Sequence, residues 1–150
     1  MRSNLICRFL IILLAAGWTS ACSRTRPQAK LKTFESALVG KWVIDVEKTN
    51  ATPVEAGLEE KRKQVIDDGL AWEFRADGTV VEAYHGLSSN KGYRVMQDAK
   101  GVTWVLISLE NNSTLFKAKL EEAALHFTAI GIFEDNKEHQ LIGPLVLTKR

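Results

Sequence analysis

The side chain best placed for chemistry is the thiol of Cys22, because of what precedes it. A basic start, an apolar run over residues 9–18 and the small residues 19–21 form the pattern of a secretory leader. The apolar run is shorter than the roughly 20 residues that span a bilayer, so cleavage is expected rather than a permanent transmembrane helix. Cleavage after Ala21 would make Cys22 the first residue of the mature chain, where its thiol is open to acylation.

This arrangement resembles the signal of bacterial lipoproteins. The resemblance implies that residues 1–21 are removed and that a lipid on Cys22 ties the mature chain to a membrane. Thr19 departs from the usual pattern, which has Leu at that position, and ordinary secretion without lipid is the alternative. Ser23 follows the cysteine where Asp would signal retention, so the resemblance to the Gram-negative sorting rule points to the outer membrane, facing the periplasm.

The other reactive side chains do not assemble into a catalytic or metal site. His85, His126 and His139 lack the spacing of metal ligands. Three pairs of adjacent acids fall at predicted helix ends or turns, where solvated charge is the better interpretation. Nucleotide-binding glycine loops, nucleophile elbows and zinc-protease motifs are all missing. We therefore expect a protein without enzymatic activity, bound metal or cofactor.

Composition narrows the function further. The chain has 20 Lys and Arg against 18 Asp and Glu, and the excess is accounted for by Arg2 and Arg8 in the leader. The mature chain is therefore neutral and lacks the basic surface that nucleic acid requires. Cys7 leaves with the leader and Cys22 would carry lipid, so the fold must be stable without a disulfide.

The rest of the chain predicts a β-rich domain over residues 33–150, preceded by a flexible tether over residues 22–32. Thr33 to Gly40 is expected to form one helical turn, with Thr33 as its cap and Gly40 at its end. The run Lys41 to Thr49 has the alternation of a first strand. Seven further strands are expected at residues 70–75, 79–85, 93–97, 102–109, 114–120, 125–132 and 141–149. The segments 86–91 and 134–138 are predicted loops, and Asp77-Gly78 predicts a tight hairpin turn.

One main helix is expected from Pro53 to Asp67, between the first two strands. Thr52 would cap it and Pro53 would occupy its first position. We expect it to lie across one opening of the barrel with Glu59, Glu60 and Lys63 in water. Its narrow apolar stripe would face inward and consists of Val54, Leu58, Val65 and Ile66.

Three short motifs suggest a family. Gly40-Lys41-Trp42 matches the G-x-W signature of lipocalins, residues 74–79 read F-x-x-D-G-T, and residues 145–150 read L-x-L-x-x-R. In this order they resemble the small bacterial lipocalin-like domain lipoproteins over residues 33–150. The resemblance implies that Trp42 is buried at a closed end of the barrel with Lys149 or Arg150 over its face. Lipocalins, however, carry their helix near the C-terminus; a helix after the first strand is topologically similar to fatty-acid-binding proteins.

The expected fold is thus mainly β: a single antiparallel up-and-down meander of about eight strands, closed into a lipocalin-like barrel, with one helix inserted between strands 1 and 2. Eight aromatic residues fall on candidate inward positions: Trp42, Trp72, Phe74, Tyr84, Tyr93, Trp104, Phe116 and Phe127. A barrel of this size either fills with side chains or holds one small ligand, and aromatics this large favour filling. The mature protein is expected to bind a small apolar ligand or lipid. The alternative is a periplasmic protein-interaction module with a filled barrel, either an envelope assembly factor or an inhibitor of a periplasmic enzyme.

Overall fold

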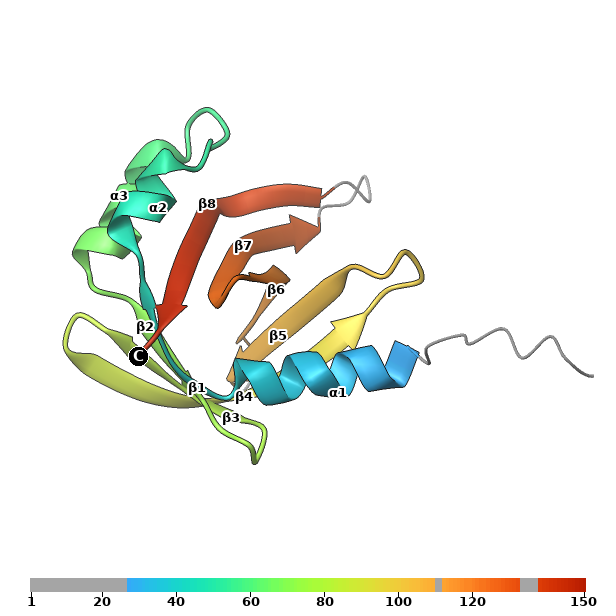
Figure 1. The fold of residues 1–150 in the computed structure, drawn as a ribbon. Helices are drawn as coiled ribbons and strands as arrows, with labels where there is room; N and C mark the ends of the chain where they lie inside the picture. Colours follow the sequence, from blue (N-terminus) through green and yellow to red (C-terminus); the bar gives the residue numbers. More distant parts are fainter. Residues whose placement is uncertain (1–26, 110–111, 133–137) are drawn as a thin grey trace, which may run out of the picture.

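The computed structural model describes residues 27–109, 112–132 and 138–150, in which eight antiparallel strands close into a barrel (Figure 1). Each strand pairs with the next along the chain, and β8 returns to pair with β1. The elements are α1 (Pro27–Leu38), β1 (Gly40–Ile44), α2 (Val46–Ala51), α3 (Glu59–Asp67), β2 (Ala71–Phe74), β3 (Thr79–Tyr84), β4 (Leu87–Gln97), β5 (Thr103–Leu109), β6 (Asn112–Glu121), β7 (Ala124–Ile132) and β8 (Glu138–Lys149). The predicted fold class is confirmed, and the architecture is consistent with a lipocalin-like fold.

The predicted Asp-Gly turn joins β2 to β3. The Asp77 carboxylate accepts hydrogen bonds from the Thr79 amide at 2.9 Å and from the Thr79 hydroxyl at 2.6 Å. Gly78 has φ +84°, a left-handed conformation that glycine adopts without steric cost. The turn sets the register in which Trp72 faces Glu82 and Phe74 faces Val80.

Helix α1 closes one end of the barrel, which we call the closed end. Leu31, Phe34 and Leu38 recur at helical spacing and pack against the core. The helix begins at Pro27, a residue suited to a first helical position, so the predicted tether is helical from residue 27 onward. Thr33 is not a cap, because its hydroxyl donates to the Ala29 carbonyl within the helix.

The segment between β1 and β2 differs from the prediction. The first strand ends at Ile44, because the Asp45 carboxylate accepts from the Lys48 amide and begins α2. Thr52 lies at the C-terminal end of α2 and not at the start of a longer helix, and α3 begins only at Glu59. Both helices pack against β8, beyond the ends of the short strands β1 and β2 (Figure 1).

The apolar stripe of the inserted segment is only partly buried. Val65 joins the core, while Val54, Leu58 and Ile66 are half-buried. The side chains expected in water are exposed, namely Glu59, Glu60 and Lys63.

Strand β4 is longer than predicted. It begins at Leu87, so the predicted loop 86–91 is mostly strand. Its polar residues alternate between the two faces of the barrel wall instead of forming a turn. The predicted leader, Cys22 and the first part of the tether lie outside the described residues, as do most of the expected turns at 110–112 and 134–138.

Candidate functional site

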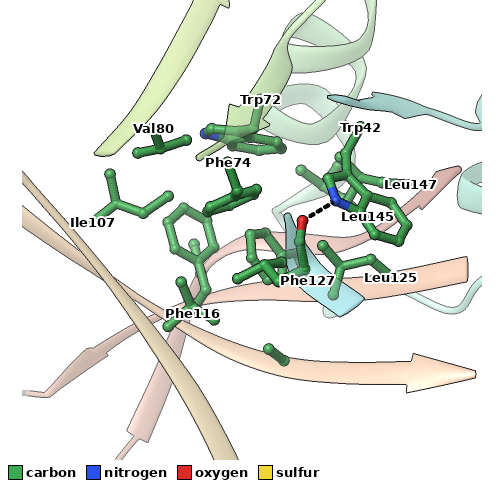
Figure 2. Packing of buried hydrophobic residues seen from close by; sticks show 14 of the residues in the cluster. Trp42, Trp72, Phe74, Val80, Ile107, Phe116, Leu125, Phe127, Leu145 and Leu147 are labelled. Carbon is green, nitrogen blue, oxygen red and sulfur yellow. Dashed lines mark hydrogen bonds between the residues drawn. The ribbon is translucent and has the colours of Figure 1, made fainter. Parts of the chain in front are cut away.

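Trp42 has a structural place at the closed end. Its side chain is 1 % exposed, and its indole N–H donates to the Leu38 carbonyl at 2.7 Å (Figure 2). The Lys149 ammonium lies 5.5 Å from the ring centroid and also donates to the Ala37 carbonyl. The predicted position of Trp42 is therefore confirmed, and Lys149 is the cation over its face.

Four of the other predicted aromatics form an interior cluster, which we call the aromatic cluster: Trp72, Phe74, Phe116 and Phe127. Trp72 meets Phe116 and Phe127 edge to face, at centroid distances of 5.8 and 5.7 Å (Figure 2). Phe116 stacks on Phe127 at 4.9 Å. This part of the barrel is filled by side chains, as the size of these residues predicts.

The two tyrosines are half-buried and pack against the core. Tyr93 meets Phe74 edge to face at 5.0 Å, and its hydroxyl donates to the Arg75 carbonyl. Burial raises the pKa of Tyr93. Because its ring contacts Phe74, Tyr93 extends the aromatic cluster toward β4.

Trp104 was expected to point inward, and the structure places it on the outer face. Its neighbour Val105 is fully buried, and side chains alternate along a strand. Its indole N–H donates to the Asp98 carboxylate at 3.3 Å, and the Lys117 ammonium lies 5.6 Å from its ring. Trp104 is thus excluded from any interior site.

Beside the aromatic cluster the inner wall becomes polar. Glu82 lies directly opposite Trp72 in the β2–β3 register, and Lys91 lies opposite the buried Val80. One Glu82 oxygen accepts from the Trp72 indole N–H at 3.1 Å, and the other accepts from the Lys91 ammonium. Both charged side chains are 22 % exposed. An ion pair therefore stands on the inner face of the wall, within reach of solvent.

A second polar group lies two residues further along β3. The Tyr84 hydroxyl donates to one Asp68 oxygen, and the His85 ring nitrogen lies 3.0 Å from the other. The hydrogen bond to Asp68 raises the pKa of Tyr84, to which burial and the charges of Asp68 and Glu82 also contribute. The Asp68 side chain is only 10 % exposed. These contacts join the end of α3 to the β3–β4 hairpin.

The chemistry available at this wall is that of hydrogen-bond donation. One Glu82 oxygen accepts from Trp72 and the other from Lys91, so Glu82 holds Lys91 in place. An ammonium has three N–H groups, and in the part of the chain that the structure describes one of those of Lys91 is directed to Glu82. The other two are suited to an acceptor, above all an anionic one.

Sequence reasoning did not single out Glu82 or Lys91. It interpreted the adjacent acids Asp67 and Asp68 as solvated charge, whereas the Asp68 side chain is only 10 % exposed and contacts Tyr84 and His85. The sequence did carry a signal for Glu82. Val80, Glu82 and Tyr84 lie at alternate positions of one strand and so share a face, and Val80 is apolar. The sequence carried no such signal for Lys91, because this residue falls in a segment predicted to be a loop.

The surface of the molecule also carries open grooves. Three open surface grooves measure about 670, 660 and 580 Å³, and none of them is lined by residues of the aromatic cluster. Within the described residues, no three His, Cys, Asp or Glu side chains gather to hold a metal ion. None of the helices over those same ranges has the length and hydrophobicity to cross a membrane.

The fold and the site thus define a closed eight-stranded barrel with a polar inner wall beside an aromatic cluster. Comparison with protein-family models, curated proteins and solved structures finds no match to this chain. The resemblance to lipocalin-like lipoproteins accordingly stays a prediction from its three short motifs.

Proposed function

We propose that the mature chain is a lipid-anchored envelope protein whose barrel binds a small amphiphile and catalyses no reaction. The ligand has an apolar body and one acceptor-bearing polar group, which is met by Lys91. The observation that carries this proposal is the Glu82–Lys91 ion pair on the inner wall. The anchor is the lipid expected on Cys22, at the outer membrane facing the periplasm.

The energetics of the ion pair support a binding role. Removing two charges from water costs free energy that their attraction often fails to recover, and an apolar pair of equal size would stabilise a barrel as well or better. Glu82 and Lys91 face inward next to Trp72 and Val80, which are fully buried. A pair at this position is explained by recognition of a polar group more readily than by stability.

The test uses an anionic amphiphile and its neutral counterpart. A fluorescent long-chain fatty acid and the corresponding alcohol are titrated into the protein and into Lys91→Met, which keeps the length of the side chain. We expect the fatty acid to bind the wild type and to lose about tenfold or more in affinity to Lys91→Met, because a charged hydrogen bond is lost. Lys119→Met is the control, since Lys119 is exposed on the outer face. Equal affinities for all three proteins would contradict the role of Lys91.

A second candidate function is a protein-interaction module, and the filled aromatic cluster favours it. Large rings occupy the interior around Phe127, which is fully buried, and leave less room for an apolar body. In that case neither the fatty acid nor the alcohol binds. That result would replace the ligand proposal while leaving the anchor untouched.

The anchor has its own test. Cys22→Ser should move the protein from the membrane to the soluble fraction and abolish labelling with a fatty-acid analogue. If Cys22→Ser remains associated with the membrane, the proposed lipid anchor is contradicted.

A further inference from the structure

The distance between Cys22 and the fold limits how the domain can sit on a membrane. Pro27, where α1 begins, follows Cys22 by five residues. A fully extended chain spans at most about 3.6 Å per residue, so the start of α1 lies within about 18 Å of the cysteine. If Cys22 carries lipid, as proposed above, α1 is held next to the bilayer surface.

Helix α1 belongs to the closed end of the barrel. Its last residue Leu38 is buried there and accepts the indole hydrogen bond of Trp42. Nearer its start, Phe34 lines a groove together with Gly101 and Val102, from the turn between β4 and β5. The helix therefore runs past that turn, so this side of the barrel is drawn toward the lipid with it.

Charge complementarity favours the same orientation. Residues 22–39 carry four basic side chains and one acidic one, whereas residues 45–70 carry four basic and seven acidic ones. Lys30 and Lys32 are exposed on α1. Figure 1 shows α1 and the α2–α3 pair on different sides of the barrel. An anionic surface attracts the first side and repels the second.

We propose that the α1 side of the domain docks on anionic lipid headgroups, with α2, α3 and the β3–β4 hairpin turned away from the membrane. This inference rests on the lipid anchor of the proposed function. It orients the inner-wall site as well, because Tyr84 and Lys91 belong to the two strands of that hairpin.

The two ends of strand β4 provide label positions at a known separation, which allows a test of the orientation. Leu87 begins the strand and is 76 % exposed, and Lys100 lies in the turn just past its other end. Eleven residues of strand separate the two positions by about 35 Å. Leu87→Cys and Lys100→Cys each introduce one free thiol, since Cys22 is acylated and Cys7 is lost with the leader.

The lipidated proteins are labelled with a fluorophore and reconstituted in vesicles of phosphatidylglycerol and phosphatidylethanolamine. Nitroxide-headgroup lipids then quench the label by contact. We expect quenching several-fold stronger at position 100 than at position 87, and weaker discrimination in high salt, which screens the headgroups. Equal quenching at both positions, or stronger quenching at 87, would overturn the orientation.

Two double charge-reversal variants distinguish docking of α1 on the headgroups from simple tethering by the lipid. Lys30→Glu with Lys32→Glu should reduce quenching at position 100 while the protein stays on the vesicles. Lys61→Glu with Lys63→Glu makes the same change on α3 and should leave quenching at 100 unaltered. If both double variants behave alike, the lysines of α1 do not dock. A wild-type protein that fails to float with the vesicles would overturn the anchor itself.

Discussion

At the scale of single residues, Trp42 shows how one position holds the closed end. Its ring is buried, its N–H bonds the end of α1, and Lys149 covers its face from β8. Trp42→Ala should destabilise the protein by about 3–5 kcal/mol, as for other large core truncations. Denaturant unfolding measures this loss, with Trp104→Ala on the outer face as the less costly control. A loss below about 1 kcal/mol would show that Trp42 does not support the closed end.

Gly143 is a second residue whose size the packing dictates. A Cβ at this position would lie 2.3 Å from Val54 Cγ2 and 3.3 Å from Arg62 Cδ. Gly143→Ala should therefore cost about 1–3 kcal/mol in unfolding free energy. Gly92→Ala is the control, because its nearest neighbour would be 3.8 Å away.

A second substitution identifies the clash. Val54→Ala should recover part of the loss in the Gly143→Ala background, because it removes the methyl group that the new Cβ meets. Losses that simply add would contradict the close packing of Val54 on β8.

At the scale of elements, strands were predicted better than helix boundaries. Alternation along β5 and the Asp77-Gly78 turn are local signals, and they were sufficient to predict this strand and this hairpin. Helix α2 was missed because Val46 to Thr49 fits a strand by pattern, and its helical state depends on contacts far along the chain. The Thr49 hydroxyl bonds both the carbonyl and the amide of Val146.

The candidate site was only half predictable for a related reason. Inward aromatics follow from alternation, and all except Trp104 lie inside or at the inner wall. The Glu82–Lys91 pair instead depends on the register of β3 against β4, which no single segment specifies. Polar residues such as Ser89 and Lys91 also reduced the strand signal of β4, so its first half was predicted as a loop.

The β2–β3 turn carries a pH-dependent prediction. Hydrogen bonds from the side chain and amide of Thr79 lower the pKa of Asp77 below its ordinary value of 3.8. A lowered pKa means that this contribution to stability is present above pH 3.8 and is lost as the pH falls through the folded-state pKa. Asp77→Asn should therefore be less stable than wild type at neutral pH and should lose less stability on acidification.

Unfolding curves measured from neutral to acidic pH give the comparison. Glu60→Gln, exposed on α3, controls for the loss of one negative charge. If wild type and Asp77→Asn lose the same unfolding free energy on acidification, the proposed role of this carboxylate is refuted.

At the scale of the whole molecule, closure of the barrel is uneven. Strand β8 pairs with β7 along most of its length but with β1 only from Leu147 to Lys149. Beyond that point Asp45 and Thr49 bond the backbone of Val146, and α2 and α3 cover the strand. The inserted helices thus protect an edge that would otherwise be free to pair with another chain.

This arrangement predicts where the molecule opens first. Strand β5 is hydrogen-bonded to a neighbour on each side, whereas α3 buries only Arg62 and Val65. Few buried contacts mean a low free energy of local opening. Amides from Leu58 to Ile66 should therefore exchange with deuterium faster than those from Val102 to Leu109. They should slow when the amphiphile binds, because Asp68 at the end of α3 contacts Tyr84 and His85 beside the inner-wall site. Equal protection of both segments, with no response to the fatty acid, would make the helix pair a fixed part of the barrel wall and would favour the interaction module.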